Sequence, residues 1–168
     1  MAILQRNKIL IALIALILFF SYLASLILTS FGSVEVKTLR LDTQNNQYLI
    51  YDLYKPKIAS KENKAPFIAI IPGFQRSKEA LSNIAIELSR RGYVVALIDP
   101  YAQGLSSSSL STRAATTEGY GMFSLVEYVH SGAFEYVDID RIGATGHSMG
   151  GNAAIRGADY FGKKAIKN

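Results

Sequence analysis

Ser148 is the residue of this sequence with the clearest chemical potential, because of the glycines on either side of it. Gly146 lies two residues before it and Gly150 two residues after it, which makes the pattern Gly-x-Ser-x-Gly. In a sharp turn from a strand into a helix, side chains at these flanking positions would collide, so glycine is needed there. The pattern predicts that Ser148 lies at the apex of such a turn in a strained backbone conformation. Its hydroxyl, lifted clear of a sheet, is a candidate nucleophile.

The residues around Ser148 are those that such a turn requires. The segment before it, with Ile142 and Ala144, predicts a short buried strand, and the segment after it predicts a helix that ends at about residues 159–162. Because the first N–H groups of a helix lack internal partners, the N–H of Met149 is the expected donor to a developing oxyanion. The remaining residues of the turn receive structural roles: Gly146, His147, Gly150 and Gly151.

Residues 138–151, Asp-Ile-Asp-Arg-Ile-Gly-Ala-Thr-Gly-His-Ser-Met-Gly-Gly, resemble the nucleophile elbow of the α/β-hydrolase superfamily, closest to its esterase, lipase and dienelactone-hydrolase-like branches. The resemblance covers residues 34–168 and implies an α/β fold, with a β-hairpin followed by parallel βαβ units. It also implies a serine hydrolase that acts on an ester-like acyl bond through an acyl-enzyme on Ser148. By position, Pro72-Gly73-Phe74 stands where relatives often carry His-Gly-x, so the N–H of Phe74 is the implied second oxyanion donor. Residues 99–106 resemble the family's D-x-x-G-x-S segment, which implies a structural role for Asp99.

The base and the acid of a triad are not found where the resemblance places them. In this family they follow the serine, yet only one acid, Asp159, and no histidine follow Ser148. His147 is its neighbour on a tight turn and is expected to point away, and His130 is expected on a helix surface. We therefore expect the first half of a hydrolase, inactive by itself. Two alternatives stay open: a non-catalytic membrane-tethered remnant or binding module, and an acyltransferase or peptidase on the same fold.

The N-terminal segment has the composition of a membrane helix. Residues 9–31 carry no charge and are almost continuously apolar, and about 20 such residues span a bilayer core of roughly 30 Å. Arg6 and Lys8 precede them, which predicts a cytoplasmic N-terminus and a hydrolase domain outside. The expected division is therefore 1–33 for the stub and anchor and 34–168 for the hydrolase part. The alternative is a signal peptide cleaved near Ser30-Phe31-Gly32, with secretion of the rest.

The remaining pattern predicts alternating strands and helices. Two extended runs within residues 34–54 surround an Asn-Asn turn and predict a hairpin, followed by a loop over 55–64. Strands are expected at 67–71 and 93–98, with a helix capped by Ser77 between them, which makes a parallel βαβ unit. A loop covers 100–112, and a second helix is expected from about 116 to 131.

Composition excludes several other functions. The 168 residues suffice for one domain, contain no cysteine and contain two histidines, so disulfides, thiolate metal sites and histidine-built metal sites are not expected. The net charge of +5 is spread along the chain, which does not favour a nucleic-acid surface. The sequence contains neither of the glycine-rich nucleotide-binding motifs, Gly-x-Gly-x-x-Gly and Gly-x-x-x-x-Gly-Lys-Ser/Thr, and no cofactor is predicted. The expected partners are a small-molecule or lipid-like ester and, through residues 9–31, a membrane.

Overall fold

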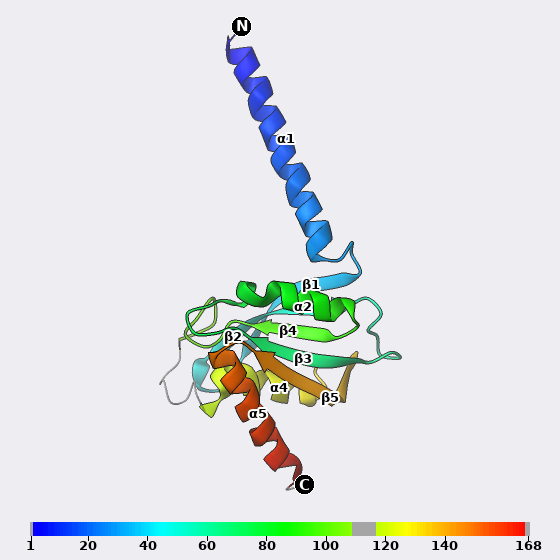
Figure 1. Ribbon diagram of the computed structural model, residues 1–168, viewed down its shortest axis with the longest axis vertical. Coiled ribbons are helices and arrows are strands. Elements are labelled where there is room, and N and C mark those ends of the chain that lie inside the picture. The colour runs from blue at the N-terminus through cyan, green and yellow to red at the C-terminus, as the bar shows by residue number, and fades with distance from the viewer. Residues whose placement is uncertain (1, 109–116, 167–168) are drawn as a thin grey trace.

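The computed structural model describes residues 2–108 and 117–166, which form a long helix standing on an α/β domain (Figure 1). Within these residues, five strands make one sheet in the order β1 (Val34–Asp42), β2 (Tyr48–Pro56), β4 (Val94–Ile98), β3 (Ala65–Ile71) and β5 (Val137–Gly146). Three consecutive parallel strands, β4, β3 and β5, form the side of the sheet that leads to Ser148. This mixed sheet is the partial α/β-hydrolase architecture that the resemblance implied.

The predicted hairpin is present at one edge of the sheet. Strands β1 (Val34–Asp42) and β2 (Tyr48–Pro56) pair antiparallel along their whole length, from Val34 opposite Pro56 to Asp42 opposite Tyr48. A short 3₁₀ turn, η1 (Gln44–Asn46), joins them, and Asn46 takes a φ of 58°, a conformation that asparagine adopts more readily than most residues. The Asn-Asn turn is therefore confirmed. Strand β2 then pairs antiparallel with β4 and connects the hairpin to the parallel part.

The parallel strands have very different surroundings. Strand β3 (Ala65–Ile71) lies between β4 (Val94–Ile98) and β5 (Val137–Gly146), and β4 is fully buried. Strand β5 is the edge strand, and most of its residues after Val137 are exposed or half-buried. The expectation of a buried strand before Ser148 was therefore wrong. Small apolar residues are compatible with either environment, and sheet order decides which one they meet.

The helices cover the sheet on two faces. Helix α2 (Ser82–Arg90) packs on one face, where Ile70, Val95 and Leu97 meet Ala85 and Ile86. Helices α4 (Met122–His130) and α5 (Met149–Ile166) cover the other face and complete the larger core. Figure 1 shows α2 above the sheet and α4 and α5 below it. The site at the end of β5 thus stands on a well-packed central sheet.

Three predicted helix boundaries differ from the structure. The helix expected at Ser77 starts as a 3₁₀ turn, η2 (Lys78–Leu81), and Ser77 makes no capping hydrogen bond. The N–H of Lys78, the first residue of this turn, donates to the Asp99 carboxylate at 2.7 Å. Helix α4 begins at Met122 rather than near 116, a position outside the described residues, since the preceding 3₁₀ turn η3 (Gly119–Gly121) holds Tyr120 at a φ of 56°. Helix α5 continues past Gly162.

Helix α1 (Ala2–Leu28) rises from the domain without packing against it along most of its length (Figure 1). Residues Asn7–Ile27 form a stretch of mean hydropathy 2.7, none of it buried, which is long and apolar enough to cross a membrane. A hydrogen-bonded turn leads from α1 into β1, since the N–H of Val34 donates to Thr29 O at 3.0 Å. Helix α1 and the sheet are therefore joined by a short structured turn.

Candidate active site

Ser148 lies in the sharp turn between β5 and α5, as predicted. Its φ is 53°, in the left-handed region that non-glycine residues rarely adopt, and the residue is exposed. The N–H of His147 donates to Ile71 O at 3.1 Å, and the N–H of Gly150 donates to His147 O at 2.9 Å. These hydrogen bonds hold the turn against the end of β3. The serine hydroxyl is thereby presented at the N-terminus of α5.

The two flanking glycines are needed because backbone atoms pass very close to them. A Cβ on Gly146 would lie 2.5 Å from both Gly150 C and Ile71 O. A Cβ on Gly150 would overlap Ile71 O and lie 2.8 Å from Pro72 O. The sequence predicted that side chains at these two positions would collide across the turn. In the structure they would also collide with the backbone at the end of β3. Gly151 is less constrained, with its added Cβ at 3.3 Å from Gly146 O.

The loop after β3 lies directly against the nucleophile turn. A Cβ on Gly73 would be 3.0 Å from Nδ1 of His147 and 3.3 Å from Cβ of Ser148. Phe74, the next residue, projects its side chain into solvent and is 70% exposed. In the described part of the chain, the structure assigns no hydrogen-bond acceptor to the N–H of Phe74 or of Met149. Both candidate donors thus lie on segments that meet at Ser148, with their N–H groups available to a ligand oxygen.

Gln103 links these two segments, and sequence reasoning missed it. Its Oε1 accepts the N–H of Arg76 at 3.1 Å, in the loop that carries Phe74. Its Nε2 lies 3.9 Å from the Sδ of Met149, within reach of a weak hydrogen bond to sulfur. The only signal in the sequence was its place inside the segment of residues 99–106. The loop after β4 thus contacts both sides of the candidate oxyanion site.

Asp99 and Lys78 fix the base of the same loops. Asp99, which is 1% exposed, accepts the N–H groups of Lys78 at 2.7 Å and Leu105 at 3.0 Å, and a Cβ on Gly104 would overlap its carboxylate. These are the contacts of a residue that shapes the turn, as expected. The buried Lys78 ammonium lies 2.8 Å from Glu79, 3.6 Å from Asp52 and 3.7 Å from Asp99. The network joins β2, the loop after β3 and the loop after β4.

The charges of this network shift two pKa values in opposite directions. Burial by itself lowers the pKa of Lys78, but the three neighbouring carboxylates outweigh it, so that the pKa lies above its usual value. The hydrogen bond from Lys78, helped by Ser77, lowers the pKa of Glu79 to about 2. Lys78 and Glu79 are therefore both charged at neutral pH. Sequence reasoning did not identify Lys78, since its partners come from distant strands.

In the part of the chain that the structure describes, neither histidine is assigned a hydrogen bond to Ser148. His147 is exposed, and its Nδ1 lies on the side of Gly73, where the Cβ of Ser148 also lies, so its orientation away from Ser148 stays a prediction. His130 is the last residue of α4, which leads into β5, so it lies at the opposite end of the sheet from Ser148. Asp159 follows Ser148 by three turns of α5, about 16 Å along the helix axis. The described residues also hold no group of three or more acids or histidines that could bind a metal ion.

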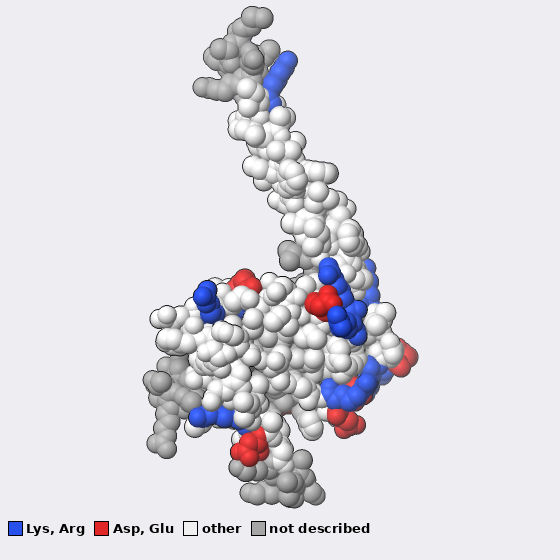
Figure 2. All heavy atoms as spheres, in the orientation of Figure 1, with Lys and Arg blue, Asp and Glu red and all other residues white. Residues whose placement is uncertain are grey.

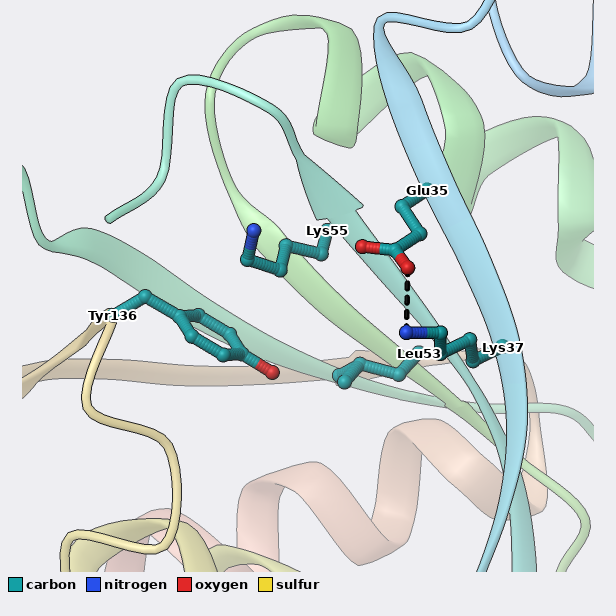
Figure 3. A pocket seen from close by; sticks show the side chains of 5 residues that line it. All are labelled: Glu35, Lys37, Leu53, Lys55 and Tyr136. Carbon is teal, nitrogen blue, oxygen red and sulfur yellow. Dashed lines mark ion pairs between the residues drawn. The ribbon is translucent and has the colours of Figure 1, made fainter. Parts of the chain in front are cut away.

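A separate pocket of about 330 Å³ lies at the other end of the sheet, as Figure 3 shows in close view. Its lining side chains are Glu35, Lys37, Leu53, Lys55 and Tyr136. The Lys55 ammonium lies 5.0 Å from the centre of the Tyr136 ring, and burial raises the pKa of this tyrosine to about 12. Because Tyr136 precedes β5 whereas Ser148 follows it, the pocket is remote from the nucleophile turn. We place the candidate site at Ser148 and not in this pocket.

The sheet order, the helices on both faces and the Ser148 turn define the chain as part of an α/β-hydrolase fold. Comparison with models of protein families gives the same fold class and identifies one family within it. A model of the PET hydrolase-like family matches residues 23–167, and the chain belongs to that family. No curated protein sequence matches it.

Solved esterase structures share the fold. The Pyrococcus furiosus esterase Pf2001 is 24% identical with a TM-score of 0.61, over 77% of this chain and 48% of its own. Acetyl xylan esterase 1 from Thermoanaerobacterium sp. JW/SL YS485 is 20% identical with a TM-score of 0.62, over 76% and 44%. The ferulic acid esterase of Streptomyces cinnamoneus is 21% identical with a TM-score of 0.59, over 76% and 55%. The chain thus spans about half the length of these enzymes.

Proposed function

We propose that the chain carries the nucleophile half of a membrane-anchored serine hydrolase that acts on ester-like acyl bonds. The observation that carries the proposal is the geometry of Ser148, an exposed serine at a φ of 53° on the N-terminus of α5 with Gly73 against it. Membership of the PET hydrolase-like family and the likeness to esterases support an ester as the substrate. The substrate class is a small-molecule or lipid-like ester.

In the proposed reaction, the Ser148 oxygen attacks the ester carbonyl carbon while a general base removes its proton. The carbonyl oxygen becomes an oxyanion that accepts hydrogen bonds from the N–H groups of Met149 and Phe74, and one such donor contributes about 3–4 kcal/mol to the transition state. The alcohol leaves with the proton from the base and an acyl-enzyme forms on Ser148. Water then attacks the acyl carbonyl, which releases the acid and regenerates the serine. No metal or cofactor is needed in this scheme.

The base and the acid of this reaction come from outside the 168 residues. His130 lies at the far end of the sheet, and His147 occupies the position next to the nucleophile in the same tight turn. A histidine from a segment beside β5 would reach Ser148 from the open edge of the sheet, because the edge strand leaves that side accessible. The isolated chain is therefore expected to be nearly inactive.

We further propose that α1 is an uncleaved anchor, with the N-terminus cytoplasmic and the domain outside. Its stretch Asn7–Ile27 meets the length and hydropathy of a membrane span, and Arg6 and Lys8 precede most of it. The region suggested for signal-peptide cleavage lies in the hydrogen-bonded turn that joins α1 to β1.

A fluorophosphonate probe, which reacts with activated serines, tests the chemistry. We expect it to label the full product of the gene strongly, the Ser148→Ala variant not at all, and the 168-residue chain almost not at all. Ser131→Ala, a change at an exposed serine far from the turn, is the matched control and should keep full labelling. Strong Ser148-dependent labelling of the 168-residue chain would show that one of its two histidines is the base. Absence of labelling in a longer product that carries a downstream acid and histidine would favour a non-catalytic role.

A further inference from the structure

The foot of α1 is held against the domain. Arg90, the last residue of α2, donates from Nη2 to Ile27 O at 3.2 Å and from Nε to Ser30 Oγ at 3.0 Å. The Lys57 N–H donates to Ser33 O at 2.9 Å. These bonds attach both the end of α2 and the end of β2 to the turn that follows the helix. The turn after α1 is thus tied to two separate elements of the domain.

Exposed apolar side chains gather around this junction. Phe31 is 77% exposed and Ile58 is 66% exposed. Ile58 lies next to the end of α2, since a Cβ on Gly92 would be 3.7 Å from its Cδ1. Phe31 is in the turn itself, with a φ of 55°. Exposed apolar side chains beside a membrane span can enter the interfacial layer of the bilayer without losing contact with water elsewhere on the domain.

Basic side chains surround the same junction. Lys57 lies beside the turn, because a Cβ on Gly32 would be 3.7 Å from its Nζ. Arg90 and Arg91 are exposed at the end of α2, and Glu87 pairs with both. The surface of Phe31, Lys57, Ile58, Arg90 and Arg91, which we call the foot surface, carries three positive charges against this one carboxylate. Figure 2 shows blue side chains gathered at the base of the helix.

The length of the span places the foot surface at headgroup level. The stretch Asn7–Ile27 has 21 residues, and at about 1.5 Å per residue it matches a hydrocarbon core of about 30 Å. In a bilayer spanned by this stretch, Ile27 would lie at the boundary of the core, and the Arg90 guanidinium, which is hydrogen-bonded to the Ile27 carbonyl, would lie at the level of the lipid phosphates. Cations with many donors suit phosphate oxygens, and they are attracted to anionic lipid surfaces.

We propose that the foot surface binds the headgroup layer of the bilayer that α1 crosses. Lys57, Arg90 and Arg91 contact the phosphates of anionic phospholipids, and Phe31 and Ile58 enter the interface beside them. The domain thus lies on the membrane instead of standing away from it. The inference rests on the proposed membrane anchoring by α1 and is independent of the chemistry at Ser148.

The absence of cysteine from the chain allows a direct test, because one introduced cysteine gives a unique labelling site. The 168-residue chain with Ile58→Cys, labelled with bimane, is reconstituted into vesicles that contain a nitroxide lipid quencher near the headgroups. We expect strong quenching in vesicles with phosphatidylglycerol and weaker quenching in vesicles of phosphatidylcholine alone. The same label at Ser131→Cys, directly after α4 at the other face of the sheet, should stay unquenched in both.

Charge reversal provides the matched variants. Lys57→Glu combined with Arg91→Glu should reduce the quenching in phosphatidylglycerol vesicles to the phosphatidylcholine value, whereas Arg141→Glu, an exposed change on β5, should leave it unchanged. Circular dichroism verifies that the variants fold. An unquenched label in a chain that resists carbonate extraction would overturn the docking proposal. If quenching were equal in the two kinds of vesicle and unchanged by charge reversal, the proposed role of the cations would be wrong. Release of the unmodified chain by carbonate would instead refute the anchoring.

Discussion

The left-handed conformation of Ser148 predicts that the nucleophile is held at a cost to stability. A residue with a Cβ in this region costs about 1–2 kcal/mol relative to an ordinary conformation, and glycine does not incur this cost. Glycine also has more conformational freedom than alanine in the unfolded state. This freedom lowers the stability of a glycine variant by about 0.5–1 kcal/mol and offsets part of the relief of strain. We therefore expect Ser148→Gly to be more stable than Ser148→Ala by about 0.5–1 kcal/mol. The alanine variant is the proper reference, because it removes the hydroxyl and keeps the Cβ.

Urea denaturation of the full chain in detergent measures this difference. With a denaturant slope of about 1.5 kcal/mol per molar, the midpoint of Ser148→Gly should exceed that of Ser148→Ala by about 0.3–0.7 M. The chain has ten tyrosines and no tryptophan, so tyrosine fluorescence together with circular dichroism reports the transition. A lower or equal midpoint for the glycine variant would refute the argument from backbone strain.

Substitutions of Glu87 provide a control, because there the glycine variant is expected to be less stable than the alanine variant. Glu87 lies inside α2 with its side chain exposed, in an ordinary helical environment. There Glu87→Gly should be less stable than Glu87→Ala by about 1 kcal/mol, because glycine is a poor helix former. The same pair of substitutions should therefore change stability in opposite directions at the two positions. If both pairs changed in the same direction, an effect of glycine unrelated to φ would explain the result.

Two further predictions concern packing and acid stability. Gly150→Ala would force a Cβ against Ile71 O, so we expect the free energy of unfolding to fall by several kcal/mol, or the variant not to fold. Gly162 has open space around it, so Gly162→Ala should be neutral or raise the free energy of unfolding by up to about 1 kcal/mol. The urea midpoints of the two variants measure the difference. The hydrogen bond from Lys78 lowers the pKa of Glu79 to about 2 from 4.5, so its stabilising effect is complete above pH 4.5 and is lost as the pH falls towards 2. Glu79→Gln should therefore flatten the stability profile between these pH values, and an unchanged profile would contradict the assignment.

The nucleophile turn could be predicted from the sequence because its requirements are local. Gly146 and Gly150 are needed by a turn of a few residues, and their spacing is visible in the chain. The contact of both with Ile71 O could not be predicted, since it depends on β3 and β5 being neighbours in the sheet. The exposure of β5 has the same origin: it reflects the order of strands and not the apolar character of Ile142 and its neighbours.

The missed residues are those whose partners lie far away in the chain. Ser77 is a good capping residue by type, but Asp99 accepts the N–H of Lys78 from another loop. Lys78 looks like an ordinary surface lysine in the sequence, but in the structure it is buried beside Asp52 of β2 and Asp99 of the loop after β4. Gln103 likewise gains its contacts only when the loops after β3 and β4 come together. Composition and periodicity carry no information about such pairings.

The order of the strands also determines when the nucleophile turn can form during synthesis. Strand β3 is synthesised before β4, although β4 lies between β2 and β3 in the sheet. The apolar β3 therefore has no final neighbour until β4 has been synthesised. Its second neighbour, β5, is made last of the five, and Phe67 meets Ile142 only then. Contacts so distant in sequence form slowly and leave apolar strands open to wrong pairing. The Ser148 turn, supported by Ile71 at the end of β3, is therefore among the last parts of the described domain to assemble, and its formation reports that the parallel strands have reached their places.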